Sequence, residues 1–219
     1  MTNIKGAIFD VDGTILDSMP IWENVAGDFL KSRGIMPRPD LNERLSTLGG
    51  SKVSEFLRAE YGIDESKDKI RDGVNGFLAD FYFNIAPLKD GILDILNVFQ
   101  ELGIKMCVAT ATDRCLIEPA LERCGILGYF GRIFTCGEED TTKRHPDIYI
   151  RASAFLGTDI ADTLVFEDAL YAVKTVKNAG FPLVAIYDLS AHEHQDEIRR
   201  ICDVHLESPA DFPMHKLGR

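Results

Sequence analysis

The sequence feature that most constrains the fold is a regular alternation of strand-like and helix-like segments that begins after Pro87. Short apolar runs recur between longer stretches of helical periodicity, and glycines end several of the helical stretches. The predicted strands cover residues 105–109, 132–135, 163–166, 181–186 and 204–206, and the predicted helices cover residues 91–102, 116–124, 147–156, 169–179 and 190–200. This alternation predicts an α/β fold with a mainly parallel sheet and helices on both of its faces.

A different pattern precedes this alternation. Residues 17–86 carry apolar side chains at helical spacing and show no strand pattern. We therefore expect two domains, which are an α/β core made of residues 1–16 and 87–219 and an all-helical cap domain made of residues 17–86. The two junctions, near residues 17–19 and 84–89, are candidate hinges.

The composition narrows the range of partners. The chain has 219 residues and a formal net charge of −11, which disfavours nucleic acid as the main partner. No apolar stretch is long enough for a membrane helix or resembles a secretory signal, so we expect no membrane association. Five cysteines without a C-x-x-C pair favour reduced thiols and a cytoplasmic location.

The first predicted strand, residues 7–9, ends in two carboxylates. Asp10 and Asp12 follow it directly, at the carboxyl end where open α/β sheets bind ligands. Because an extended segment has a period of two, both side chains can face one side. Two adjacent anions repel each other, and a hard divalent cation bound through oxygen would satisfy both. The alternative is a simple polar turn at a strand end.

Polar residues also follow three later strands. Thr110 follows one strand and Lys143 lies in the loop after the next. Glu167 and Asp168 follow a third. Taken singly, these residues have ordinary explanations, namely a helix cap, a solvated charge and complementation of a helix dipole. Since the carboxyl ends of parallel strands share one edge of the sheet, we expect the groups to converge, and their order is far more specific than any one of them.

That order resembles the haloacid dehalogenase superfamily, specifically the members with a helical cap inserted after the first motif. Within these, it resembles the phosphatases grouped with β-phosphoglucomutase. The resemblance covers nearly the whole chain and implies a Rossmann-like, doubly wound core. The residues that carry it are Phe9-Asp10-Val11-Asp12-Gly13-Thr14, Val108-Ala109-Thr110-Ala111-Thr112, Lys143-Arg144-His145-Pro146-Asp147-Ile148-Tyr149 and Val165-Phe166-Glu167-Asp168-Ala169.

The resemblance implies a phosphatase that works through an aspartyl-phosphate intermediate. Asp10 would be the nucleophile, and Asp12 would protonate the leaving oxygen and then activate water. Thr110 and Ala111 would bind the phosphoryl oxygens. Lys143 would bind there too and neutralise charge between Asp10 and the phosphoryl group.

The resemblance also implies a magnesium cofactor. Its ligands would be Asp10, the backbone carbonyl of Asp12 and Asp168, with Glu167 as a supporting acid behind them. A cap that closes over the site favours a small phosphorylated metabolite, such as a sugar phosphate, over a protein substrate. Lys52, in the expected cap loop, would meet a polar part of that substrate or stay a solvated surface lysine. We expect a monomer or a weak homodimer.

Several residues depart from the family pattern. Arg144 replaces the usual proline, while Ala169 and Ala172 replace the usual serine and glycine. None of these changes removes a catalytic group, and Arg144 is a candidate for contact with substrate. Trp22 stands where a phosphomutase of the β-phosphoglucomutase type is expected to have a histidine, so we favour hydrolysis and keep the mutase as the alternative.

Two readings from other classes are weaker. A receiver domain of two-component signalling also groups Asp, Thr and Lys around Mg²⁺, but it is about half this length and carries its acidic pair early in the chain. A non-catalytic regulator is disfavoured by the intact set of acids.

Overall fold

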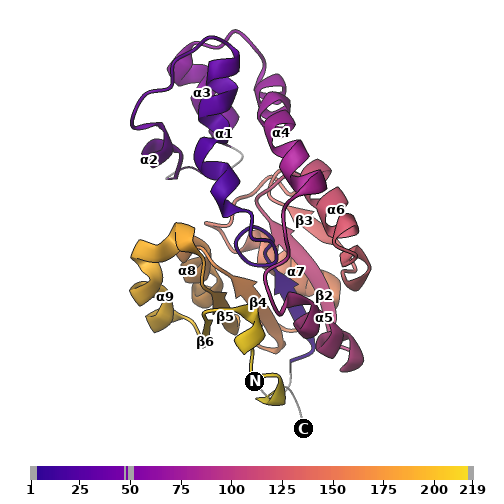
Figure 1. The fold of residues 1–219 in the computed structure, drawn as a ribbon. Coiled ribbons are helices and arrows are strands. Elements are labelled where there is room, and N and C mark those ends of the chain that lie inside the picture. Colours follow the sequence, from indigo (N-terminus) through magenta and orange to yellow (C-terminus); the bar gives the residue numbers. More distant parts are fainter. Residues whose placement is uncertain (1–3, 47, 49–51, 217–219) are drawn as a thin grey trace.

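The computed structural model describes residues 4–46, 48 and 52–216. A parallel sheet flanked by helices forms one part, and four helices stand beside it as a second part (Figure 1). The strands are β1 (Gly6–Phe9), β2 (Lys105–Thr110), β3 (Ile133–Thr135), β4 (Thr163–Glu167), β5 (Leu183–Ile186) and β6 (Val204–Leu206). The α-helices are α1 (Met19–Ser32), α2 (Leu41–Ser46), α3 (Val53–Tyr61), α4 (Lys67–Asn84), α5 (Ile92–Glu101), α6 (Arg114–Arg123), α7 (Asp147–Leu156), α8 (Leu170–Asn178) and α9 (Gln195–Ile201).

The predicted parallel α/β sheet is confirmed. Its strand order is β3-β2-β1-β4-β5-β6, and every neighbouring pair is parallel. The chain runs outward from β1 to β2 and β3 on one side, and later to β4, β5 and β6 on the other. This reversal of direction lies at β1, so the carboxyl ends of β1, β2 and β4 form the edge where a doubly wound sheet binds its ligand.

Alternation along the strands builds a core on each face of the sheet. In β1, Phe9 packs with the side of the sheet that α5 and α6 cover, whereas Ile8 packs with the side that α7, α8 and α9 cover. The Phe9 and Phe166 rings stack with centroids 4.3 Å apart, which locks β1 against β4. The strands are therefore buried on both faces, as their nearly continuous apolar sequences predict.

Helices α1 to α4, which we call the helical lobe, lie beyond the carboxyl edge of the sheet (Figure 1). The buried side chains Phe29, Leu57, Ile70 and Leu78 belong to a hydrophobic cluster that continues into the sheet side. The described residues of the lobe form helices and no strand, which agrees with the expected helical insert. The division at residues 17 and 86 stays a prediction.

The two segments that join the lobe to the sheet run side by side. The Asp17 N–H donates to Pro87 O at 3.0 Å, and the Lys89 N–H donates to Ile15 O at 2.9 Å. Leu16 and Leu88 form an isolated antiparallel bridge between these bonds. The predicted hinges thus lie in two backbone segments that hydrogen-bond to each other.

One detail of the prediction was wrong. Residues 190–200 do not form one helix: a 3-10 segment (Leu189–His194) precedes α9, and Ala191 has non-helical dihedral angles. Asp188 accepts a hydrogen bond from the Ser190 N–H at 2.9 Å and so begins a separate turn.

Two further sequence expectations meet the structure here. Cys107 is buried, and the cysteines are all free thiols. Within the described ranges, no helix is both long enough and apolar enough to cross a membrane.

Candidate active site

The strand-end residues converge on the edge formed by β1, β2 and β4. Asp10 directly follows β1, and its N–H donates to Phe166 O at 3.0 Å, so the sheet ladder continues to the site. Thr110 ends β2 and Glu167 ends β4, with Asp168 one residue later. The fold therefore brings together groups that are more than 150 residues apart in the sequence.

Lys143 links two of the carboxylates. It lies in the loop between β3 and α7, and it is only 4% exposed. Its ammonium forms an ion pair with Asp10 and contacts Glu167 Oε1 at 2.7 Å. A buried ammonium is stable only when it is paired, and these two acids pair it.

Glu167 is held by a second donor. The Tyr149 hydroxyl on α7 donates to the same Oε1 atom at 2.6 Å. The other oxygen, Oε2, is buried and has no hydrogen-bond partner among the described residues. An unpaired buried carboxylate oxygen is costly, so this atom calls for a partner that the protein chain does not supply.

The electrostatics of the site show the same deficit of positive charge. Burial, only partly offset by Lys143, raises the pKa of Asp10 to about 8. Burial also raises the pKa of Asp168 well above its usual range, and the neighbouring Asp10 and Glu167 carboxylates raise it further. For Lys143, burial alone would lower the pKa, but the carboxylates of Asp10 and Glu167 outweigh it and hold the pKa well above its usual value.

A divalent cation fits this cluster. Asp10, Glu167 and Asp168 are all buried, and each offers a carboxylate oxygen within 4.8 Å of those of the other two. An oxygen-only donor set with excess negative charge suits a hard cation such as Mg²⁺. Gly13 is part of this fit, because a Cβ built at this position would lie 2.4 Å from Asp168 Oδ2.

Asp12 has a different environment. Its Oδ1 accepts hydrogen bonds from Ser18 Oγ at 2.6 Å and from the Tyr82 hydroxyl, and its Oδ2 accepts one from Thr112 Oγ1 at 2.6 Å. Trp22 Nε1 in turn donates to the Tyr82 hydroxyl at 3.1 Å. The two carboxylates of the first motif thus differ. Asp10 pairs with the Lys143 ammonium, whereas Asp12 is held by three hydroxyl groups, of which Tyr82 lies in the helical lobe and Ser18 directly before it.

Thr110 is fully buried, and its Oγ1 accepts a hydrogen bond from the Thr112 N–H at 3.1 Å. This bond occupies an acceptor position and leaves the hydroxyl hydrogen for another group. Ala111 follows directly and is half-buried. A hydroxyl donor and backbone N–H groups at a strand end, beside the start of α6, are suited to binding phosphoryl oxygens.

Other predicted site residues are not drawn into this cluster. Lys52 is exposed just before α3, and residues 49–51 beside it lie outside the described part of the chain, so its role stays a prediction. Arg144 is also exposed, with its guanidinium carbon 4.9 Å from the centroid of the Tyr171 ring. Ala172 is fully buried in α8, which explains why its small side chain fits there.

Sequence reasoning missed Tyr149, Tyr82 and Ser18 as parts of the site. Tyr149 stood within a quoted motif, but its helical spacing marks it only as a core residue. Tyr82 follows Leu78 by one helical turn in α4, and that spacing also marks it only as a core residue. A hydroxyl group on the buried face of a helix is the signal that could have identified both tyrosines, because such a group usually finds a polar partner.

Comparison with known proteins now adds to this geometry. Hexitol phosphatase B of Escherichia coli is 24% identical over 94% of this chain and 92% of its own length. N-acetylmuramic acid 6-phosphate phosphatase of Pseudomonas aeruginosa is 24% identical over 95% and 93%. The crystal structure of β-phosphoglucomutase from Clostridium difficile has the same fold, with a TM-score of 0.76 and 20% identity over 97% of this chain and 94% of that one.

The family model described as haloacid dehalogenase-like hydrolase matches residues 4–180, which include all the strand-end residues of the site. The parallel sheet, the helical lobe and the converging acids agree with that match. The chain therefore belongs to the haloacid dehalogenase-like hydrolases.

Proposed function

We propose that this hydrolase is a Mg²⁺-dependent phosphatase that cleaves a small phosphorylated metabolite through an aspartyl-phosphate on Asp10. One observation carries the proposal: a buried lysine joins Asp10 to Glu167, beside a third buried carboxylate, Asp168. A nucleophilic carboxylate that must meet an anionic phosphate needs this local positive charge. Family membership and the named activities of the relatives support the same reaction class.

In the first half of the reaction, an Asp10 carboxylate oxygen attacks phosphorus and the bond from phosphorus to the leaving oxygen breaks. Asp12 gives its proton to that oxygen, and the free alcohol departs. In the second half, a water oxygen attacks phosphorus, Asp12 takes the proton of that water, and the bond to Asp10 breaks. The products are the alcohol and inorganic phosphate, and both aspartates return to their starting states.

The surrounding residues position these groups. Lys143 touches Asp10 and can reach a phosphoryl oxygen from the same place. Thr110 offers its hydroxyl hydrogen to a second phosphoryl oxygen. The hydroxyls of Ser18, Tyr82 and Thr112 fix the Asp12 carboxylate, which gives the proton transfer a defined direction.

Asp10, Asp168 and the backbone carbonyl of Asp12 would hold the magnesium ion, and the structure adds Glu167 as a neighbour of the same cluster. Bound Mg²⁺ would supply charge neutralisation between nucleophile and phosphate, and it would orient the phosphoryl oxygens. The oxygen donors and the orphaned Glu167 Oε2 atom support this assignment.

The named activities of the relatives and the position of the helical lobe support a proposal for the substrate class. Two relatives are named for hexitol phosphates and for N-acetylmuramic acid 6-phosphate, so we propose a phosphorylated sugar or sugar alcohol. A helical lobe whose side chains reach Asp12 leaves room for a small molecule more readily than for a folded protein. Lys52 and Ala111 are proposed to contact this substrate. A cytoplasmic location and a monomer or weak homodimer remain predictions.

The test is a panel of hexose, pentose and hexitol phosphates together with nucleotides, assayed for release of inorganic phosphate. We expect turnover of at least one sugar or hexitol phosphate with Mg²⁺, and loss of turnover in excess chelator that returns when Mg²⁺ is restored. Equal activity with and without chelator would refute the metal dependence. Failure on every phosphate monoester would refute the reaction class.

A further inference from the structure

Glu167 is anchored from one side only, and Tyr149 provides half of the anchor. Two donors, Lys143 Nζ at 2.7 Å and the Tyr149 hydroxyl at 2.6 Å, converge on Oε1. Both donors are buried, and Glu167 itself is fully buried. Two bonds therefore hold Oε1 in place, and Oε2 has no hydrogen-bond partner among the described residues.

The Tyr149 ring is itself fixed. It lies in the first turn of α7, is fully buried in the core on that face of the sheet, and packs against Phe181 with ring centroids 6.4 Å apart. A buried aromatic ring cannot move its hydroxyl without disturbing its neighbours. The direction of the hydroxyl is thus imposed by core packing, and α7 transmits that rigidity to Glu167.

The hydroxyl is needed because Lys143 is shared. The ammonium also pairs with Asp10, so it does not on its own determine how the Glu167 carboxylate is turned. Without a second donor, the carboxylate could turn partway about its last bond and keep only its bond to Lys143. Such a turn would shift the oxygens of Glu167 relative to the carboxylates of Asp10 and Asp168, which offer oxygens within 4.8 Å of it.

We propose that Tyr149 is a positioning residue for the cation site: its hydroxyl holds Glu167 Oε1, so that Oε2 stays available to a cation and Lys143 stays on Asp10. The proposal rests on the proposed Mg²⁺-dependent function. Groups that hold a metal-binding carboxylate in place typically contribute ten- to a hundred-fold to metal affinity or activity. The Tyr149 hydroxyl bonds to Glu167, so its effect is expected to pass through that residue.

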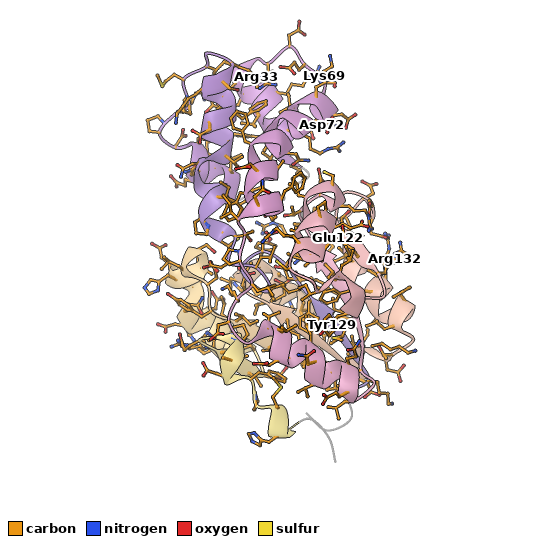
Figure 2. All side chains as sticks on the ribbon, turned by 45° about the vertical axis from the view of Figure 1, so that its right-hand side comes forward. Arg33, Lys69, Asp72, Glu122, Tyr129 and Arg132 are labelled. Atoms are coloured by element: carbon orange, nitrogen blue, oxygen red, sulfur yellow. The ribbon has the colours of Figure 1, made fainter. Side chains whose placement is uncertain are left out.

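The experiment compares the unchanged protein with Tyr149→Phe and with the control Tyr129→Phe. The control also removes one tyrosine hydroxyl bond, from Tyr129 (labelled in Figure 2) to Asn97 Oδ1 in α5 at 2.5 Å, and neither residue belongs to the proposed site. Mg²⁺ binding is measured by calorimetry without substrate, thermal unfolding is measured with and without Mg²⁺, and the Mg²⁺ dependence of turnover is measured separately.

We expect Tyr149→Phe to weaken Mg²⁺ binding about tenfold or more and to reduce the stabilisation by Mg²⁺, while kcat largely recovers at saturating Mg²⁺. Tyr129→Phe should keep the original Mg²⁺ affinity. If Tyr149→Phe lowers only the melting temperature and binds Mg²⁺ as well as the control, the tyrosine is merely structural and the proposal is overturned. If the unchanged protein binds no Mg²⁺, the proposed metal dependence is overturned, and this proposal with it.

Discussion

At the scale of single residues, the site holds more buried negative than positive charge, and Asp10 and Asp168 are both destabilised in their ionised forms. Burial raises the pKa of Asp10 to about 8 in spite of Lys143, so the fold disfavours the carboxylate at neutral pH. The folded pKa lies above the unfolded value of 3.8, so ionisation of Asp10 lowers stability as pH rises through that window. Function, rather than stability, explains a carboxylate at this position.

We therefore predict opposite effects of Asp10→Asn on activity and on stability. Turnover should fall to background, because an amide is not a nucleophile towards phosphate. The melting temperature in chelator at pH 7 should rise, by roughly 2–4 °C for each 1 kcal/mol gained in a chain of this size. Phosphate release and thermal unfolding measure the two effects, and a lower melting temperature would contradict the electrostatic argument.

Lys143→Met should lower the stability of the fold, in contrast to Asp10→Asn. It removes the cation from two buried carboxylates, and breaking a buried ion pair on one side costs about 3–5 kcal/mol. Denaturant unfolding in chelator measures this loss. The matched control is Lys5→Met, which breaks an exposed ion pair with Asp162 at 2.6 Å and should leave the midpoint almost unchanged. Similar losses in both variants would argue against a special role for burial.

Asp12 is predicted to act as the general acid, and leaving groups can test this. An alkoxide must be protonated as it departs, whereas a nitrophenolate leaves unaided. Asp12→Ala should therefore slow sugar phosphates by about 10²–10⁴-fold more than an aryl phosphate. Comparing kcat/KM for the two substrate types in both proteins gives the ratio directly. Equal slowing of both types would show that Asp12 only organises the site.

At the scale of elements, the turn after β1 leaves room for Asp168, which follows β4. Gly13 has a φ of +76°, and a Cβ there would lie 2.4 Å from Asp168 Oδ2. Gly34 has nearly the same φ, +71°, but nothing lies within 4 Å of its Cβ position. A comparison of substitutions at the two glycines can therefore distinguish the cost of backbone strain from the cost of a steric clash with Asp168.

Gly13→Ala and Gly34→Ala should each lose about 1–2 kcal/mol from the left-handed backbone conformation. Only Gly13→Ala should also lose Mg²⁺ binding and turnover, because its methyl group displaces Asp168. Denaturant unfolding gives the shared cost, and calorimetry with Mg²⁺ gives the difference. A Gly13→Ala protein that binds Mg²⁺ normally would show that Asp168 can move aside without consequence.

The elements also show how far the sequence could lead. The positions of Asp10, Thr110 and Glu167 followed from apolar runs that end in polar residues, because parallel strands present their carboxyl ends together. The hydrogen-bond partners of those groups could not be predicted from the sequence. Tyr149 and Tyr82 repeat at helical spacing among apolar residues, and only the packing of one element on another gives their hydroxyl groups a partner. Periodicity reports which face of a helix is buried, but it does not report what that face meets.

At the scale of the whole molecule, the lobe and the sheet meet at Asp12. Ser18 precedes α1 and Tyr82 lies in α4, and both bond to this carboxylate, which follows β1. The connecting segments are joined by hydrogen bonds between Asp17 and Pro87 and between Ile15 and Lys89, so the two predicted hinges would move as a pair. The position of the lobe is thereby coupled to the group that is expected to transfer the proton.

This coupling bears on whether the enzyme hydrolyses a sugar phosphate or, like a mutase, transfers the phosphoryl group to another hydroxyl of the sugar. A mutase of the β-phosphoglucomutase type is expected to have a histidine where this chain has Trp22, and the indole N–H of Trp22 is bonded to the Tyr82 hydroxyl at 3.1 Å. Trp22 thus supports the partner of Asp12 and offers no imidazole to a sugar hydroxyl. We expect water to be the acceptor of the phosphoryl group.

Incubation with β-glucose 1-phosphate and a trace of the bisphosphate should therefore release inorganic phosphate, if it is a substrate at all, and no glucose 6-phosphate. A sugar phosphate that turns over in ¹⁸O-labelled water should yield phosphate with one labelled oxygen, because water attacks phosphorus in the second half of the reaction. Steady isomerisation without phosphate release would replace the hydrolase with a mutase. The fold, the acidic cluster and the family would stand unchanged, because both reactions need the same aspartyl-phosphate and differ only in which hydroxyl removes it.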